Sequence, residues 1–376
     1  MNKANLIIIL AVMILIGLFG NAINIIVLSR KTMRNIATFR LLLFLSLLDF
    51  LVLIICASDT LLSFGFEIDF RIYSTFICRI HMFLTYFLTH TSSIVLTLIS
   101  IERVCVVYDF DLMTFFRIRS ENNRKLKFVN VYRDSTIKRI NESNSIENTE
   151  YENKNRFIRF LQLNRIDLIV FLIMIVILIM NLHFLIFFNL IEMNLTFETN
   201  NLDILSENMT NISTAVINRS KVICSPVLNS RYENFLKHIW TWLDVSIYSF
   251  VPFMIMFVSS IMILLKINKT TSSFLNSLVN KNNNFNRKIT KRRLKKNKQM
   301  SLMLFLNNIY FAVCTIPFFV IYNLNRGHYF DENNYYEGLF AFVQILSYSN
   351  NSINFIFFGI FSHKYRNEFF TVFRLK

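Results

Sequence analysis

The segment from Phe39 to Leu62 reads FRLLLFLSLLDFLVLIICASDTLL and carries the carboxylate of Asp49 in the middle of an apolar run. As a helix, a run of this length fits the hydrocarbon core of a bilayer. An ionisable side chain at that depth is costly and usually marks a functional site. Other apolar segments contain the polar residues Ser92, Asn350 and Asn354. We therefore expect these side chains to join Asp49 inside a bundle of helices.

The whole chain has the composition of a helical membrane protein. Its 376 residues are 54% hydrophobic and include three prolines and six glycines. Apolar runs of about 20 residues recur along it. They predict seven spans, at residues 6–28, 39–62, 76–107, 166–191, 239–267, 300–324 and 335–360. The runs lack the alternation of lipid-facing barrel strands, so the expected fold class is an all-α membrane protein, a seven-transmembrane helix bundle.

Basic residues indicate how the chain is oriented. The first apolar run is too long for a signal peptide and has no small-residue cleavage site, so we expect a retained helix. The basic residues beside the first and fifth connections are Arg30, Lys31, Arg34, Arg40, Lys291, Arg292, Arg293, Lys295, Lys296 and Lys298. They place these connections in the cytoplasm and the N-terminus outside a plasma membrane. Anionic lipid and topology account for the net charge of +16, so nucleic acid is not an expected partner.

The loop 192–238 carries signals of an extracellular location. Its glycosylation acceptors are Asn194, Asn208, Asn211 and Asn218. Acceptors at Asn141 and Asn268 fall on the expected cytoplasmic side, so chance acceptors occur in this Asn-rich chain. The cluster nevertheless agrees with the orientation that the basic residues give.

Two cysteines lie on the expected outer side. Cys78 lies at the outer end of the third span and Cys224 in the loop 192–238. We expect them to form a disulfide in the oxidising compartment, the alternative being two unrelated thiols. Cys56, Cys105 and Cys314 lie within or at the inner edge of spans, where a free cysteine acts as a small hydrophobic residue.

Motifs in separate spans follow one order. They are Gly20-Asn21, Leu45 to Asp49, Cys78, Glu102-Arg103-Val104, Pro252, Phe311, Cys314 to Pro317 and Asn350 to Phe358. In this order the chain resembles the rhodopsin-like G-protein-coupled receptors over nearly its whole length. The segment Cys78 to Ser93 is similar to invertebrate neuropeptide-type and orphan receptors. The chain departs from the family in lacking Trp in its fourth span and in carrying Thr315, Phe355 and Phe358 where Trp, Pro and Tyr are usual.

The resemblance implies a receptor that binds a neuropeptide outside and activates a heterotrimeric G protein inside. Arg103 would be held by Glu102 at rest and freed to meet the G protein when the sixth helix moves. The alternative is an interfacial pair that snorkels to the membrane surface. No acidic partner for Arg103 is evident in the sixth helix, so we expect a weak resting lock and basal activity.

The resemblance also implies a sodium pocket and moving helices. Sodium would bind Asp49, Ser92, Asn350 and Asn354, because hard cations prefer oxygen ligands; a water-filled network is the alternative. No other cofactor is expected. Asn21, Phe311, Thr315 and Phe358 fall at the family's switch positions. Pro252 and Pro317 would kink the fifth and sixth helices, as pivots or as static bends.

A ligand site is expected among the outer halves of the helices. The candidates, each also compatible with ordinary packing, are Thr85, Tyr86, Thr89, Phe318, Phe319, Tyr322, Gln344 and Tyr348. Thr85 stands where aminergic receptors carry Asp, so a biogenic amine is not expected. Asp69 and Asp244 are candidates for contact with a basic peptide, or for simple exposure to water.

Two polar or amphipathic segments complete the chain. The long polar cytoplasmic loop 109–165 could regulate coupling or be an unselected expansion. In the segment 361–376, Phe361, Tyr365, Phe369 and Phe373 recur every four residues, which predicts an amphipathic helix on the cytoplasmic leaflet.

Other classes of protein fit less well. A transporter is not favoured, because the sequence shows no internal repeat. An enzyme is not expected, because His81, His90 and His183 lack paired acids or metal-ligand spacing in the sequence. The second hypothesis is a pseudo-receptor, which binds or traffics without coupling to a G protein.

Overall fold

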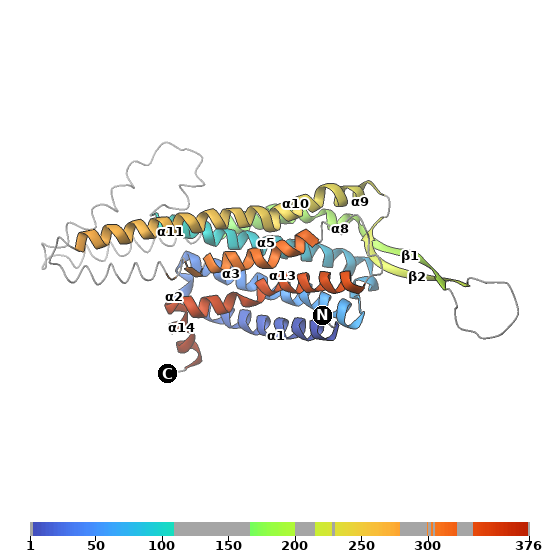
Figure 1. Cartoon of the computed structure of the whole chain (residues 1–376), viewed down its shortest axis with the longest axis horizontal. Helices are drawn as coiled ribbons and strands as arrows, with labels where there is room; N and C mark the ends of the chain where they lie inside the picture. Colours follow the sequence, from blue (N-terminus) through green and yellow to red (C-terminus); the bar gives the residue numbers. More distant parts are fainter. Residues whose placement is uncertain are drawn as a thin grey trace.

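The chain folds into a bundle of long helices with a β-hairpin at one end (Figure 1). The computed structural model describes residues 3–108, 166–199, 215–227, 230–278, 299, 302–303, 305–321 and 334–374. Within these ranges, five helices are long and apolar enough to cross a membrane: Lys3–Leu28, Ala37–Gly65, Thr75–Val107, Ile166–Phe187 and Arg231–Thr270. The chain is therefore a helical protein suited to a membrane.

The first three long helices agree closely with the predicted spans. Helix α1 covers Lys3–Leu28, and a single turn, α2 (Lys31–Arg34), follows it. Helix α3 (Ala37–Val52) continues through the π-turn η1 (Leu53–Ala57), α4 (Ser58–Thr60) and the π-turn η2 (Leu61–Gly65). The 3₁₀ turn η3 (Phe70–Tyr73) then leads into α5 (Thr75–Val107).

The last two predicted spans are also helical. A shorter apolar helix covers Phe305–Ile321, and α13 covers Asn334–Phe361. Neither belongs to the five helices that are long and apolar enough to cross a membrane, so a count of seven spans stays a prediction. The chain ends in α14 (His363–Phe373).

The fourth span is shorter than predicted, and the chain is not purely helical. The helix Ile166–Phe187 ends in α8 (His183–Phe187), and strand β1 (Phe188–Thr199) follows directly. It pairs antiparallel with β2 (Ala215–Pro226), from Phe188 opposite Pro226 to Thr199 opposite Ala215. A short apolar run does not distinguish helix from strand, which is why the predicted span extended to residue 191.

The fifth helix begins eight residues before the predicted start at residue 239, at Arg231. It runs through α9 (Arg231–Phe235), η4 (Leu236–Trp240), α10 (Thr241–Val245), η5 (Ser246–Phe250) and α11 (Val251–Leu278). The Ser230 hydroxyl accepts a hydrogen bond from the Glu233 backbone N–H, 3.1 Å away, in the Ser-x-x-Glu pattern of a capping box. That pattern was the available signal for the earlier start.

Small residues let α1 and α13 approach closely. A Cβ at Gly20 would collide with the Phe355 ring, and one at Gly17 would collide with Ser352 and Leu53. Phe355 thus fills the space left by a glycine, at a position where the resembled family usually has proline. The main core packs α3 and α5 around buried Leu45, Val52 and Ile99.

The two ends of the bundle differ. The hairpin and the N-terminus lie at one end, and α14 and the C-terminus lie at the other (Figure 1). Arg103 and Thr38 belong to the end with α14, whereas Cys78 belongs to the end with the hairpin. We call the end with α14 the inner end and the end with the hairpin the outer end, after the orientation that the basic residues predict.

Candidate functional site

A fully buried carboxylate joins three helices at the middle of the bundle. Ser92 Oγ from α5 and Asn351 Nδ2 from α13 each donate to Asp49 Oδ1 at 2.8 Å. Asn354 Nδ2 donates to the other oxygen at 2.6 Å. The sequence correctly predicted that Ser92 and Asn354 lie at Asp49. The prediction of Asn350 as the third partner was wrong, because Asn351 donates to Asp49 instead. We call Asp49, Ser92, Asn351 and Asn354 the central cluster.

The amide oxygens around the central cluster have the chemistry of a cation site. The Oδ1 atoms of Asn350, Asn351 and Asn354 are buried and have no hydrogen-bond donor among the described residues. Asn21 lies next to them, because its Nδ2 donates to the Asn351 carbonyl at 2.9 Å. Oxygens without donors beside one carboxylate fit a hard cation such as sodium. Asp49 and these amides would hold it by supplying oxygen ligands and one compensating charge.

At the inner end, Glu102 and Arg103 form the expected pair, with an additional partner. Glu102 Oε2 accepts a 2.6 Å hydrogen bond from Thr38 Oγ1 of α3 and lies 3.6 Å from Arg103 Nε. The short bond therefore goes to the threonine, and the contact with arginine is longer than a hydrogen bond. Arg103 Nε is buried without a hydrogen-bond partner in the part of the chain that the structure describes. We call Thr38, Glu102 and Arg103 the inner cluster.

Two of the switch positions, Phe311 and Thr315, lie at the contact between the fifth and sixth helices. Thr315 is buried, donates to the Phe311 carbonyl at 2.8 Å and lies 3.2 Å from Ser249 Oγ. A small polar pair thus occupies the position where the resembled family carries Trp. Phe358 is buried further inward, 6.4 Å from the Tyr365 ring between ring centroids.

Proline at position 252 has a visible local consequence. Because Pro252 has no N–H, the carbonyl of Tyr248 loses its helical donor. Ser93 Oγ of α5 donates to that carbonyl instead, at 2.5 Å. The π-turn η5 (Ser246–Phe250) ends two residues before the proline. Pro317 lies within the helix Phe305–Ile321.

The predicted ligand residues do not all present free polar groups. Thr85 and Thr89 donate to carbonyls of their own helix, at 2.9 and 2.7 Å. The Tyr86 ring stacks on Phe184 at 4.2 Å. Gln344 donates to Thr60 Oγ1 at 3.0 Å. Phe319 packs against Tyr248, and Phe318 packs against Phe319 and Phe340. The Tyr348 hydroxyl lies 3.5 Å from Thr60 Oγ1. Tyr322 lies outside the described residues.

Two of the three histidines have acidic partners, contrary to the expectation from the sequence. His90 is fully buried, and its Nε2 lies 2.8 Å from Asp244 Oδ1, while its Nδ1 lies 3.3 Å from Asn181 Nδ2. His81 Nε2 lies 3.8 Å from Asp59 Oδ2. These residues are 154 and 22 positions apart, and sequence spacing carries no signal for such pairs. Asp244, a candidate for a basic peptide, is thus already paired.

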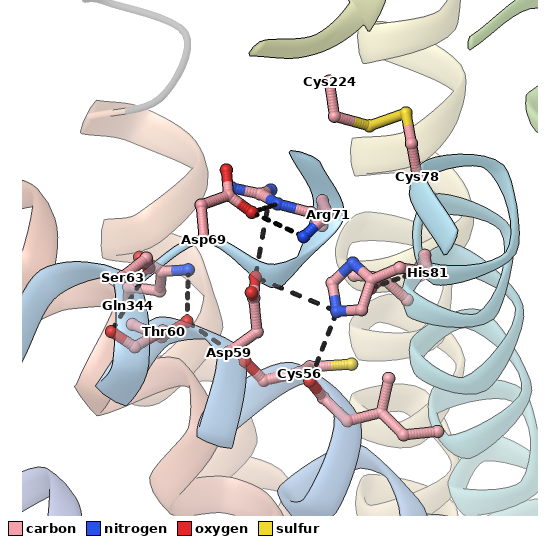
Figure 2. A network of polar contacts seen from close by, with 12 residues as sticks. Cys56, Asp59, Thr60, Ser63, Asp69, Arg71, Cys78, His81, Cys224 and Gln344 are labelled. Carbon is pink, nitrogen blue, oxygen red and sulfur yellow. Dashed lines mark hydrogen bonds and ion pairs between the residues drawn. A yellow bond between two sulfur atoms is a disulfide. The ribbon is translucent and has the colours of Figure 1, made fainter. Parts of the chain in front are cut away.

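Asp69 is also already paired, at the outer end. Its carboxylate accepts two hydrogen bonds from the Arg71 guanidinium, at 2.7 and 2.8 Å, and one from the Arg71 backbone at 2.9 Å. Burial alone would raise the pKa of the Asp69 carboxyl, but the Arg71 hydrogen bonds and charge outweigh it and lower that pKa. We call Asp59, Asp69, Arg71 and His81 the outer network (Figure 2).

The predicted disulfide is present. Cys78 at the start of α5 is bonded to Cys224 in β2, with Cα atoms 5.6 Å apart. The bond fixes the hairpin to the bundle directly above the outer network (Figure 2). Cys56, Cys105 and Cys314 are buried and form no disulfide.

The remaining predictions fall mainly outside the described residues. Asn194 lies in β1 and Asn218 in β2, whereas Asn208, Asn211 and the loop 109–165 lie outside. Within the described ranges, no group of three or more His, Cys, Asp and Glu side chains could hold a metal ion.

Comparisons of the chain with protein-family models and with curated proteins find no match. The assignment of function therefore depends on the three polar clusters and on the order of the motifs.

Proposed function

We propose that the chain is a rhodopsin-like G-protein-coupled receptor in the plasma membrane, with its N-terminus outside. It would bind a neuropeptide at the outer end and activate a heterotrimeric G protein at the inner end. The inner cluster supports this proposal best. Among the described residues, Arg103 has a 3.6 Å contact to a carboxylate that Thr38 engages at 2.6 Å, so the resting contact is longer than a hydrogen bond.

The central cluster supports the same function from within the bundle. One charge at Asp49 ties together α3, α5 and α13 through three hydrogen bonds. Burying a charge without partners is costly, so these helices can move apart only if the carboxylate finds other partners or takes up a proton. A receptor needs such a pair of alternative packings to relay binding from one end to the other.

Basal signalling of two inner-cluster variants tests the proposal. In cells expressing a panel of Gα subunits, we expect Arg103→Ala to abolish basal G-protein activation. We expect Glu102→Gln to raise it, because losing a preference of about 1 kcal/mol for the resting packing shifts a two-state equilibrium roughly fivefold. Surface amount is measured in parallel to exclude differences in expression.

A matched control removes another cation near the inner end. Arg40 pairs with Asp167 at 2.7 Å, outside the inner cluster, so Arg40→Gln is expected to leave basal activation unchanged. Equal signalling from the wild type and Arg103→Ala, with every Gα subunit, would contradict the proposal. Surface display without any activation, including with a panel of amidated neuropeptides, would favour the pseudo-receptor instead.

A further inference from the structure

The outer network contains a buried carboxylate whose hydrogen-bonding capacity is unused. Asp59 in α4 is 8% exposed. Its Oδ2 lies 3.8 Å from both Arg71 Nη1 and His81 Nε2, which is too far for a hydrogen bond. Its Oδ1 is buried and has no partner within the described ranges of the chain. A buried carboxylate ordinarily has donors on both oxygens.

The nearby arginine compensates Asp59 only in part, because Asp69 engages it more closely. Asp69 binds the Arg71 guanidinium through both of its oxygens, at 2.7 and 2.8 Å. The outer network therefore has two carboxylates and one guanidinium, which leaves one excess negative charge when His81 is neutral. Figure 2 shows the Asp59 carboxylate joined by dashed lines to Arg71 and to the His81 ring.

His81 adds a second unused acceptor. Its Nε2 lies 3.4 Å from the Ile55 carbonyl, which can only accept, so Nε2 carries the hydrogen. In the neutral ring Nδ1 is then a lone-pair acceptor. This atom is buried and has no partner among the residues that the structure describes, and His81 is 6% exposed. Asp59 and His81 thus offer an anionic and a neutral acceptor without donors.

We propose that Asp59 and His81 bind the cationic end of an extracellular ligand, a guanidinium or ammonium group that carries several N–H donors. This inference rests on the proposed receptor function and moves the acidic contact for the ligand from Asp69 and Asp244 to Asp59. Such a cation supplies both the charge and the donors that the two acceptors lack. Asp69 and Arg71, whose side chains are 28% and 27% exposed, are the members of the outer network that reach solvent.

The position of Asp59 links this contact to the rest of the bundle. Thr60, the next residue, accepts the 3.0 Å hydrogen bond from Gln344 of α13. The same helix α13 carries Asn351 and Asn354 of the central cluster. A cation bound at Asp59 therefore lies beside a hydrogen bond between the helix that it contacts and α13.

Three simple probes test the proposal on the purified chain in lipid nanodiscs, without a G protein. Phenethylguanidinium has charge and donors, phenethylurea has donors without charge, and phenethyltrimethylammonium has charge without N–H donors. Dissociation constants are measured by ligand-observed NMR. We expect the guanidinium to bind at least about tenfold more tightly than either analogue, as for one charge-assisted hydrogen bond. We expect Asp59→Asn to abolish that preference.

Two further variants keep the test decisive. Arg71→Gln removes the competing cation from a partly exposed position and is expected to tighten guanidinium binding by about tenfold. Glu67→Gln removes an exposed carboxylate that pairs with Lys3 at 3.3 Å, and it is expected to change nothing. Equal binding of the three probes, a preference that survives Asp59→Asn, or unchanged affinity in Arg71→Gln would each overturn the proposal. Basal signalling through Arg103 is measured without ligand, so these outcomes are independent of the test of receptor function.

Discussion

At the scale of single residues, Asp49 shows how a buried charge is tolerated in an apolar bundle. Three donors satisfy its oxygens, and the amide oxygens of Asn351 and Asn354, two of the donating residues, are buried without donors among the described residues. An arrangement with more acceptors than donors is electrostatically unfavourable until a cation or water joins it. The cluster is therefore expected to respond to sodium.

Sodium is expected to stabilise the wild-type chain but not Asp49→Asn. At ten times its dissociation constant, a ligand stabilises the folded state by about 1.4 kcal/mol, which raises Tm by roughly 2 °C in a protein of this size. Tm is measured in sodium chloride and in N-methylglucamine chloride at equal ionic strength. Asp167→Asn, which removes a carboxylate outside the central cluster, should keep the difference. A wild-type Tm that is the same in both salts would exclude the sodium site.

Single residues also show which parts of the candidate sites could be predicted from the sequence. Asp49, Ser92 and Asn354 were identifiable because polar residues stand out in apolar runs. Asn351 was missed in favour of its neighbour Asn350, because one residue is a rotation of about 100° on a helix and span boundaries do not fix that rotation. Asp59 was missed because it lies near the end of a predicted span, where a carboxylate is usually hydrated and attracts no notice.

At the scale of elements, α14 illustrates a helix whose apolar face has two possible partners. The pattern Phe361, Tyr365, Phe369 and Phe373 predicted a helix on the membrane surface. In the structure Phe361 is the last residue of α13, Tyr365 and Phe369 of α14 pack against the bundle core, and Phe373 is exposed. Ser362 caps the helix by accepting from the Tyr365 N–H at 3.2 Å. The period of the pattern predicted the helix, but periodicity cannot say whether lipid or protein covers the apolar face.

Docking of α14 is expected to depend on the Tyr365 hydroxyl. It donates a 2.6 Å hydrogen bond to Asn24 Oδ1 in α1, and burial keeps the pKa of the phenol above its usual value, so it is a donor at neutral pH. Tyr365→Phe leaves a buried acceptor unsatisfied, at a cost of about 1–3 kcal/mol.

Hydrogen exchange measures this loss. Amides of α14 should exchange about tenfold faster or more in Tyr365→Phe. Thr371→Ala removes a hydroxyl that bonds within α14, to the Asn367 carbonyl at 2.8 Å, and should change exchange little. Equal protection in the wild type and Tyr365→Phe would show that the hydroxyl does not hold the helix.

The hairpin shows a limit of the same kind. The residues of β1 continue an apolar run, and their strand conformation depends on pairing with β2. Strand β2 begins at Ala215, 27 residues after the start of β1 at Phe188. Such long-range pairing is invisible to a local pattern. The disulfide was predictable only because both cysteines were assigned to one side of the membrane.

At the scale of the whole molecule, the two ends of the bundle have opposite characters. The outer end has the disulfide, the hairpin and the outer network, whereas the inner end has the inner cluster and α14. Arg30 pairs with Glu368 at 3.2 Å at the inner end, and Lys364 donates to the Thr32 carbonyl at 3.0 Å. The concentration of basic residues at that end favours a cytoplasmic location under the positive-inside rule.

Glycosylation is the most direct test of that orientation, because acceptors of the same chemistry lie towards both ends. Asn194 and Asn218 lie in the hairpin strands, and Asn268 lies in the inner half of the fifth helix. Only acceptors that face the lumen during synthesis can receive a glycan. In cells, replacing Asn194, Asn208, Asn211 and Asn218 together by Gln should therefore remove the electrophoretic shift that a glycosidase produces in the wild type. Asn268→Gln, alone or with Asn141→Gln, should leave that shift intact. A glycan found at Asn268 would require the bundle to be inverted, with Arg103 outside the cell, and no G protein could then reach it.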